Sequence, residues 1–350
     1  MFMSKLSIRI PRRSFVAAAS IALVLAGCRS ALVDESRPIR VGTYNIRFSG
    51  SSRWIADRGT PNIWESRKAD LVALIRQLDL DVFGLQEVCP DQAAYLRENL
   101  PGYTFVGEHR EADRISGEAS PVCYRTSRFD ELKAGTFWLS ETPDVPGLKG
   151  WGAACPRVCS YLVLRDRVTG RRFCFANTHT DHVSAEAREK GMLLIIERMR
   201  EFGAGCPIVF TGDHNCRETE APALAVSSIL TNALYAAETP PAGSWRTFNG
   251  WKWRDREYPA VDALKLPASL RNACKGSPDA NRDGNGKHVW EECGARIDYI
   301  YVSSGVRVLD YATRADPRPG EKLYPSDHFP VVSTIVLGDF PIVTAQTAVE

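Results

Sequence analysis

The chain has 350 residues, of which 44% are hydrophobic and 25% are charged. This is an ordinary globular composition with enough apolar material for one large core or two smaller ones, without internal repeats or low-complexity tracts. The formal net charge is +2, and residues 1–27 contain 4 basic and no acidic residues, so residues 28–350 carry 2 − 4 = −2. A mature chain without excess positive charge argues against a protein that grips long nucleic acids.

The amino terminus has the pattern of a bacterial export signal. Its basic residues are Lys5, Arg9, Arg12 and Arg13. They precede the apolar run 15–26, which is too short to span a bilayer. The run ends in Leu25-Ala26-Gly27-Cys28, which is typical of a lipoprotein cleavage site with Cys28 as the lipidated residue. The alternative is a plain secretory signal cut nearby.

These features predict a signal peptide over 1–27 and a tether over 28–36. Arg12-Arg13 also resembles the twin-arginine export motif, although Pro11 stands where Ser or Thr is usual. Residue Arg29 after the lipid site is not Asp, so we expect an exported lipoprotein on the periplasmic side, in the outer membrane rather than the inner one.

Apolar periodicity predicts alternating strands and helices in the mature chain. The expected strands are 39–48, 81–88, 121–124, 158–165, 172–178, 208–211, 297–302 and 331–337. The expected helices are 64–78, 93–100, 184–202 and 221–234. No composition break divides this region, so we expect one α/β domain over 37–338, with two sheets packed together and helices outside, followed by a tail over 339–350.

The strand 208–211 ends abruptly at Gly212, and a carboxylate and an amide follow it. Asp213 and Asn215 are two residues apart, so an extended backbone places both side chains on the same face. Such a pair suits the orientation of a water molecule or the binding of a phosphoryl oxygen. Gly-Asp-x-Asn is also ordinary turn chemistry, so this stretch alone does not decide between a site and a turn.

Polar residues also stand at the ends of other predicted strands. They are Asn45, Glu87, Asn177 with His179, and Asp327 with His328, together with Asp298 at the start of a strand. Buried charges are costly unless they pair with one another or bind a metal. Several carboxylates in one cleft therefore indicate a site for a metal ion and a phosphate group.

This constellation resembles the endonuclease/exonuclease/phosphatase superfamily of metal-dependent phosphoesterases. The matching segments are Thr43-Tyr44-Asn45, Gly84-Leu85-Gln86-Glu87-Val88, Asn177-Thr178-His179, Thr211-Gly212-Asp213-His214-Asn215, Arg296-Ile297-Asp298-Tyr299-Ile300 and Ser326-Asp327-His328-Phe329-Pro330. They occur in the family's order over residues 40–335. The resemblance implies a four-layer α/β sandwich, in which two mixed sheets are flanked by helices.

The resemblance also implies a role for each position. Glu87 with Asn45 would bind the metal, and Asp327 would help to hold a second ion. A site this rich in oxygen suits Mg²⁺ or Mn²⁺. His179 would hydrogen-bond the phosphate, and Asp213 would orient or deprotonate the attacking water.

Further roles follow from the same resemblance. Asn215 would contact a phosphoryl oxygen, and Asp298 would hold the imidazole of His328, which would stabilise or protonate phosphoryl oxygens. Tyr124 and Arg157 resemble substrate-side positions. His214 departs from the apolar residue usual at its position; tuning of the site and binding of a second metal are alternatives, and a solvent-facing side chain is expected.

The cysteines predict two disulfides in an exported protein. The candidate pairs are Cys155 with Cys159 and Cys274 with Cys293, whereas Cys174 and Cys206 lie beside apolar strand residues and fit buried thiols.

Three other features receive no catalytic role. Residues 279–286 match half of a calcium-binding loop, but position twelve is Trp290 instead of Glu, which favours a polar turn. His109 and His182 fit loop or surface histidines. The tryptophans Trp245, Trp251 and Trp253 could form a substrate platform, although aromatic residues in such a loop more often pin it to the core.

The predicted function is hydrolysis of a phosphodiester or phosphomonoester by metal-assisted attack of water, by a monomer acting on a compact substrate. A nuclease is the first alternative. A catalytically silent binding lipoprotein is the second, but it would be expected to lack Glu87, Asp213 or His328, and all three are present. A serine hydrolase is excluded because no Gly-x-Ser-x-Gly occurs.

Overall fold

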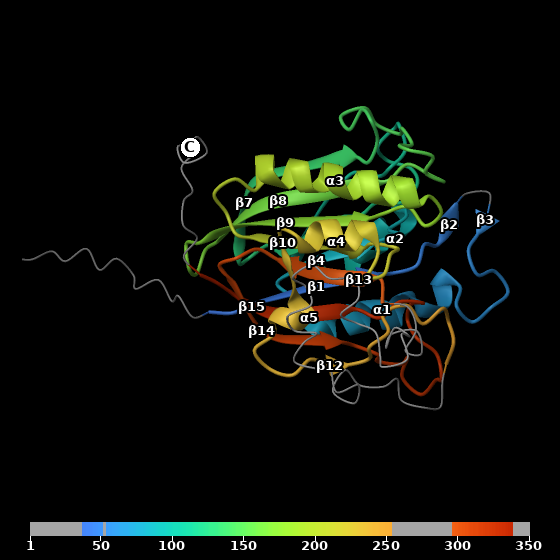
Figure 1. Cartoon of the computed structure of the whole chain (residues 1–350). Helices are drawn as coiled ribbons and strands as arrows, with labels where there is room; N and C mark the ends of the chain where they lie inside the picture. The colour runs from blue at the N-terminus through green and yellow to red at the C-terminus, as the bar shows by residue number, and fades with distance from the viewer. Residues whose placement is uncertain (1–36, 52–53, 254–295, 339–350) are drawn as a thin grey trace, which may run out of the picture. The chain divides into compact units, whose positions relative to one another are not determined.

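The computed structural model describes residues 37–51, 54–253 and 296–338, and two mixed β-sheets occupy the centre of this part of the chain (Figure 1). Its helices are α1 (Trp64–Leu78), α2 (Pro90–Asn99), α3 (Ala185–Phe202), α4 (Ala221–Ser227) and α5 (Ala233–Ala236). Its strands are β1 (Ile39–Asn45), β2 (Gly50–Ser51), β3 (Trp54–Ile55), β4 (Val82–Gln86), β5 (Tyr103–Val106), β6 (Val122–Arg125), β7 (Phe129–Trp138), β8 (Val158–Asp166), β9 (Arg172–His179), β10 (Ile208–Asp213), β11 (Thr231–Asn232), β12 (Ala242–Gly243), β13 (Asp298–Val302), β14 (Val306–Thr313) and β15 (Val331–Leu337).

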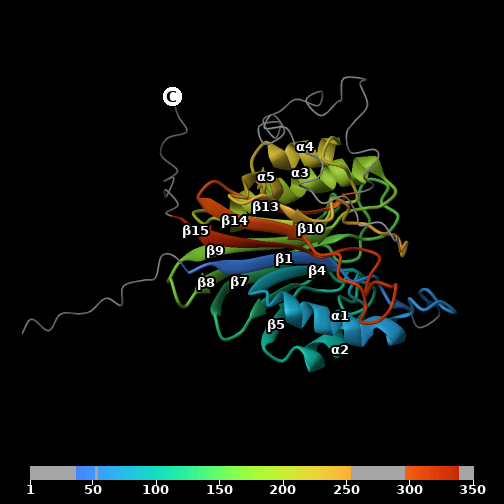
Figure 2. The same ribbon diagram turned by 90° about the horizontal axis from the view of Figure 1, so that it is seen from below.

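The predicted four-layer sandwich is confirmed. One sheet has the strand order β12-β14-β15-β1-β4-β6-β5, and the other has the order β11-β13-β10-β9-β8-β7. Buried side chains such as Val41, Val82, Phe175 and Val209 fill the space between the two sheets. Helices α1 and α2 cover the outer face of the first sheet, and α3 and α4 cover the outer face of the second (Figure 2).

The pairing of the strands brings the polar strand ends to one edge of the sandwich. β1 runs parallel to β4, and β9 runs parallel to β10, so the carboxyl ends of each pair lie together. β13 runs antiparallel to β10, and its first residue, Asp298, lies opposite Asp213, the last residue of β10. On the other side of β10, His179 is the partner of Asp213. Residues far apart in the sequence therefore meet at this edge.

A buried polar network joins the two sheets beneath that edge. The Nε2 of Gln86 donates to the Oδ1 of Asn177 at 2.6 Å and to the Oγ1 of Thr43 at 2.9 Å. The amide of Asn177 donates to the carbonyls of Leu85 and Pro121. A Cβ on Gly84 would meet Asn177 Oδ1 at 2.1 Å, so glycine is needed for this close approach between the sheets. The network fixes the register of the strands that position the site.

Local sequence signals predict several element bounds well. Helix α1 and strand β15 have the predicted bounds. Helix α3 starts one residue later than predicted because Ser184 is its N-cap, and the Oγ of Ser184 accepts from the backbone N–H of Ala187 at 3.1 Å. Within the described residues, the structure contains no helix that is long and apolar enough to cross a bilayer.

Other expected elements are wrong or incomplete. The helix predicted over 221–234 is two short helices, α4 and α5, because strand β11 lies between them and pairs with β13. The sequence analysis missed β5, β7 and β14, as well as the two-residue strands. The pairing of β14 with β15 shifts between Val308 and Asp310, and such a bulge breaks the alternation of inward and outward side chains that indicates a strand. β1 ends at Asn45 instead of residue 48, and Arg47 already has a positive φ of 58°.

Candidate active site

A cavity of about 530 Å³ lies at the edge where the polar strand ends meet. The side chains around it include Arg47, Phe48, Glu87, Arg110, Glu118, Cys155, Arg157, His179, His182, Asp213, Asn215, Phe248, Asp327 and His328. Seven of the residues expected from the sequence are among them: Glu87, Arg157, His179, Asp213, Asn215, Asp327 and His328. Asn45 and Asp298 lie directly behind this surface and hold its members in place, as the hydrogen bonds below establish.

Asn45 connects the two sheets at the floor of the site. Its Nδ2 donates to the Oε1 of Glu87 at 3.0 Å and to the Oδ2 of Asp213 at 2.9 Å. Glu87 is the first residue after β4 and has a φ of +63°, a conformation uncommon for a residue with a side chain. The backbone N–H of Phe48 donates to the other oxygen of Glu87 at 2.9 Å. The strained backbone and two donors thus orient the Glu87 carboxylate.

His328 lies between two carboxylates. Its Nδ1 is 2.9 Å from the Oδ2 of Asp298, and its Nε2 is 3.7 Å from the Oδ2 of Asp213. Burial alone would disfavour the charged ring, but the carboxylates of Asp298 and Asp213 outweigh this effect and raise the pKa of His328 to about 10. His328 is therefore an imidazolium at neutral pH, with Nδ1–H donating to Asp298 and Nε2–H available on the cavity side.

Asp213 has the properties of a group that can exchange a proton near neutral pH. Burial raises its pKa to about 7, and the neighbouring Asp298 carboxylate adds to this effect. The amide of Asn45 and the backbone N–H of Asn215, 3.0 Å from Oδ1, hold the carboxylate in place. A positioned carboxyl with such a pKa suits a general base for water.

His179 and Asn215 form a pair beside Asp213. The Nδ2 of Asn215 is 2.9 Å from the Nε2 of His179 and donates to the carbonyl of Thr180 at 3.1 Å. Burial, together with the positive charge of Arg157, lowers the pKa of His179 well below its usual range. The ring is therefore neutral, and its Nδ1 has no hydrogen-bond partner in the part of the chain that the structure describes.

The oxygen donors of the site fit a divalent cation. Burial opposes ionisation of Glu87, but His328, the Asn45 amide and the Phe48 N–H together lower its pKa, so it is a ready anionic ligand. Burial raises the pKa of Asp327, and the nearby Glu87 carboxylate adds to this, which indicates negative charge that Arg47, 3.6 Å away, does not fully offset. A hard cation among these oxygens would supply the missing charge.

A second group could also bind a metal ion by geometry. Asp213, Asp298 and His328 each present one ligand atom within 4.8 Å of the others. The Nδ1 of His328 is engaged by Asp298, so this trio is better described as a hydrogen-bonded acid–base unit next to the oxygen donors of Asn45 and Glu87.

The structure does not bring Tyr124 to the cavity, so its interpretation as a substrate-side residue is wrong. β6 runs antiparallel to β4, and Tyr124 lies opposite Val82, at the end of β4 remote from Glu87. Its ring is part of the core between the sheets, and its hydroxyl donates to Glu131 at 3.2 Å. Arg157, by contrast, is buried in the wall of the cavity.

His214 does not face solvent, contrary to expectation. It is fully buried, and its ring is stacked on Phe210 and Tyr301, with centroid distances of 4.9 and 5.8 Å. Burial lowers the pKa of His214 to about 3, so the ring stays neutral. The residue follows β10, whose carboxyl end turns the ring into the core between the sheet and α3 rather than toward the cavity.

The predicted Cys155–Cys159 disulfide is also wrong, since both residues are free thiols. Cys159 belongs to β8 and is buried under α3, whereas Cys155 lies in a loop on the wall of the cavity. Cys174 and Cys206 are buried free thiols, as predicted. The Cys274–Cys293 pair and the calcium-like loop 279–286 lie outside the described residues.

Trp245 is buried in the core between the sheets, as expected for a residue that anchors its loop. His109 is partly buried, and its Nδ1 lies 3.0 Å from the carbonyl of Gly117. His182 is exposed, as expected for a surface histidine, but it also lies on the wall of the cavity, which the sequence did not indicate.

Sequence reasoning also missed three charged residues of the cavity. Arg47 follows Asn45 by two residues and pairs with Asp57 and Asp327. Arg110 and Glu118 come from a loop after β5, and Arg110 Nη1 lies 2.8 Å from Glu118 Oε2. Nothing in the local pattern around 108–118 marks a site, because these residues reach the cavity only through the fold of that loop.

Comparisons with known proteins agree with this geometry. A model of the endonuclease/exonuclease/phosphatase family matches residues 42–328, a range that contains every catalytic and metal-binding residue predicted above. The structure of a mannosyl-6-phosphatase from Bacteroides thetaiotaomicron is similar, with 31% identity and a TM-score of 0.70 over 85% of this chain and 100% of that one.

Curated relatives match over shorter stretches. An uncharacterized protein of Acanthamoeba polyphaga mimivirus is 25% identical over 43% of this chain and 59% of its own length. Tyrosyl-DNA phosphodiesterase 2 of Bos taurus is 23% identical over 40% of this chain and 34% of its own length. The chain thus spans less than two thirds of the length of these relatives.

Proposed function

We propose that the chain, which belongs to the endonuclease/exonuclease/phosphatase family, is a hydrolase of phosphoester bonds that uses a divalent cation to hydrolyse a compact organic phosphate with water. The observation that carries this proposal is the arrangement of Asp213. Its carboxylate lies 2.9 Å from the Asn45 amide and 3.7 Å from the His328 imidazolium, at the wall of a cavity large enough for a small substrate.

Asn45 and Glu87 would hold the cation, with Asp327 beside them. Once bound, the cation would polarise a phosphoryl oxygen and offset the charge that develops during attack. The oxygen-rich donor set favours Mg²⁺ or Mn²⁺ over softer metals.

The protein's own groups supply the rest of the chemistry. Asp213 accepts a proton from the attacking water, for which its pKa of about 7 is suited. The Nε2–H of His328 donates to a phosphoryl or leaving-group oxygen, while Asp298 keeps the imidazolium oriented. His179, a neutral ring, offers Nδ1–H to another phosphoryl oxygen, and Asn215 fixes that ring from the opposite nitrogen.

Two observations favour a small substrate. The mature chain is formally −2, whereas proteins that follow long nucleic acids neutralise many phosphates with Lys and Arg. The similar mannosyl-6-phosphatase acts on a sugar phosphate by its name, and it matches 85% of this chain. A nuclease-like activity remains the second candidate, because the shorter match to tyrosyl-DNA phosphodiesterase 2 points to a phosphodiester.

A substrate screen tests the proposal. The purified mature chain is assayed against sugar phosphates, nucleotides, phospholipids and duplex DNA, with Mg²⁺, with Mn²⁺ and with a chelator. We expect hydrolysis of at least one compact phosphate, abolished by the chelator and restored by added metal. Full activity in the chelator would contradict metal dependence. Preferred cleavage of duplex DNA, with a steep loss as salt increases, would instead favour the nuclease.

The proposed location is the periplasmic face of the outer membrane, through a lipid on Cys28. The support is the sequence Leu25-Ala26-Gly27-Cys28 after a basic and apolar leader. Cells given a fatty-acid probe should label the native protein, and Cys28→Ala should remove the label and release the protein from membranes. An unlabelled native protein in the soluble fraction would refute the lipid anchor.

A further inference from the structure

A buried arginine lies in the cavity wall with part of its hydrogen-bonding capacity unused. Arg157 is 5% exposed. Its Nε is 3.7 Å from Asp181 Oδ2 and makes no hydrogen bond, and its Nη2 is 2.8 Å from His182 Nδ1. Its Nη1 has no hydrogen-bond partner among the described residues. A guanidinium can only donate, so this group is suited to an anion that enters the cavity.

The contact with Arg157 sets the tautomer of His182. Because Arg157 is the donor, His182 Nδ1 must accept, and the neutral ring then carries its proton on Nε2. Burial and the charge of Arg157 lower the pKa of His182, which favours this neutral form. His182 therefore adds a second N–H donor to the same wall of the cavity.

Arg110 brings a second guanidinium to this wall. Its Nη1 is 2.8 Å from Glu118, while its buried Nε makes no hydrogen bond. Cys155 lines the same cavity; burial raises the pKa of its thiol, and the nearby charges of Arg157 and Arg110 oppose this effect. We define Arg110, Arg157 and His182 as the arginine wall of the cavity.

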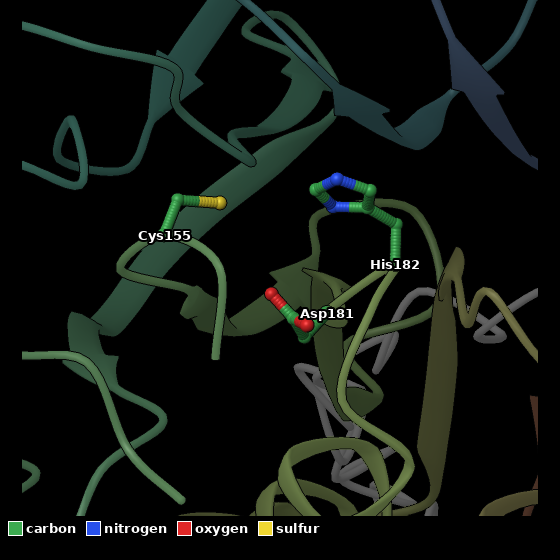
Figure 3. A group of neighbouring side chains, drawn as sticks. All are labelled: Cys155, Asp181 and His182. Carbon is green, nitrogen blue, oxygen red and sulfur yellow. The ribbon is translucent and has the colours of Figure 1, made fainter. Parts of the chain in front are cut away.

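The neighbouring side chains Cys155, Asp181 and His182 could be taken for a metal site instead. Their ligand atoms lie within 4.8 Å of one another, and Figure 3 shows the thiol and the imidazole pointing toward each other beside the carboxylate. However, the carboxylate of Asp181 already accepts from the backbone N–H groups of Ala154, Val183 and Ser184. The lone pair of His182 Nδ1 is taken by Arg157, whose positive charge would repel a cation. These three side chains therefore favour the binding of an anion over the binding of a metal cation.

We propose that the arginine wall binds a second anionic group of the substrate, so that the preferred substrate is a compact phosphoester carrying another phosphate, sulfate or carboxylate. This inference rests on the proposed function. The phosphoryl group that reacts is already bound by Asp213, His328 and the donor set of Glu87, which line the same cavity. Arg110, Arg157 and His182 line that cavity as well, so the two anion positions share one volume of about 530 Å³.

A graded series of inhibitors tests the second position without knowledge of the natural substrate. Methylphosphonate offers one anionic group, and alkane diphosphonates of increasing length offer two. Both are tested against the best substrate of the screen, with Mg²⁺ in excess. At one or more lengths the diphosphonate should inhibit roughly tenfold to a hundredfold more tightly, the range expected for a charge-assisted hydrogen bond. Arg157→Gln should abolish this gain and leave inhibition by methylphosphonate unchanged.

Arg165→Gln is the matched control. Arg157 directly precedes β8, whereas Arg165 lies near the other end of that strand, is half exposed and pairs with Asp130, so the variant should keep the full gain. Two results would overturn the inference: no diphosphonate binding better than methylphosphonate, or equal weakening of both inhibitors by Arg157→Gln. Equal weakening of inhibition by both compounds would mean that Arg157 binds the reacting phosphoryl group or supports the loop that contains Asp181.

The two proposals can fail separately. If the chain hydrolyses no phosphoester, the proposed function fails. The same series is then titrated by calorimetry into the full chain, where a gain for the diphosphonate that Arg157→Gln removes would still support the arginine wall. If the chain is active but the series shows no gain, only the arginine wall is refuted.

Discussion

Asp213→Asn is expected to lower kcat by roughly two orders of magnitude or more, the usual contribution of a positioned general base. The amide has nearly the shape of the carboxyl, and its single oxygen can still accept from either the Asn45 amide or the backbone N–H of Asn215, so one of the two hydrogen bonds is kept. It cannot take a proton from water, a step for which the pKa of Asp213, raised to about 7 by burial, is suited. Steady-state kinetics on the best substrate at saturating Mg²⁺ measures the loss.

Two controls separate chemistry from metal binding and from folding. Asp130→Asn removes a half-buried carboxylate of β7 that pairs with Arg165 and Arg167 and does not line the cavity, so it should leave kcat unchanged. Glu87→Gln should lose activity mainly at low Mg²⁺ and recover as the metal concentration increases, because it removes a charge from the ion. Added metal should not restore Asp213→Asn. Turnover by Asp213→Asn close to the native value would exclude Asp213 as the base.

The sequence predicted most of the site because the site lies at strand ends. Asn45, Glu87, His179 and Asp213 directly follow or end buried strands, and apolar runs that stop at polar residues are visible without a structure. Side chains at the carboxyl ends of neighbouring parallel strands necessarily meet at one edge. The Oδ2 of Asp298 lies 2.9 Å from the Nδ1 of His328, the residue with which the sequence pairs it.

The parts that the sequence could not predict depend on contacts between distant segments. Arg110 and Glu118 reach the cavity through the path of a loop that has no periodicity of its own. His214 looks like a polar residue near a site, but the direction of its ring is set by packing against Phe210 and Tyr301. The prediction for Tyr124 is wrong because strand pairing, which a single sequence does not reveal, places this residue at the end of β4 remote from Glu87.

The second large effect is expected at His328 and Asp298. His328→Ala should lower kcat by roughly two orders of magnitude or more, because it removes the charged donor next to the reacting group. Asp298→Asn should cost a similar factor without touching the substrate. Its carboxylate holds His328 Nδ1 at 2.9 Å and, with Asp213, overcomes the effect of burial to raise the pKa of His328 to about 10. An amide there would weaken both the orientation and the charge of the ring.

Because the two residues act as one unit, their losses should not add. The double variant Asp298→Asn/His328→Ala should be little slower than His328→Ala alone, since without the imidazole Asp298 has nothing to orient. The comparison cycle pairs Asp298→Asn with Arg165→Gln, a distant exposed site, and should be additive. Each kcat is measured at saturating substrate and Mg²⁺, with the melting temperature as a check on folding. Losses that multiply in the double variant would mean that Asp298 acts on catalysis independently of His328.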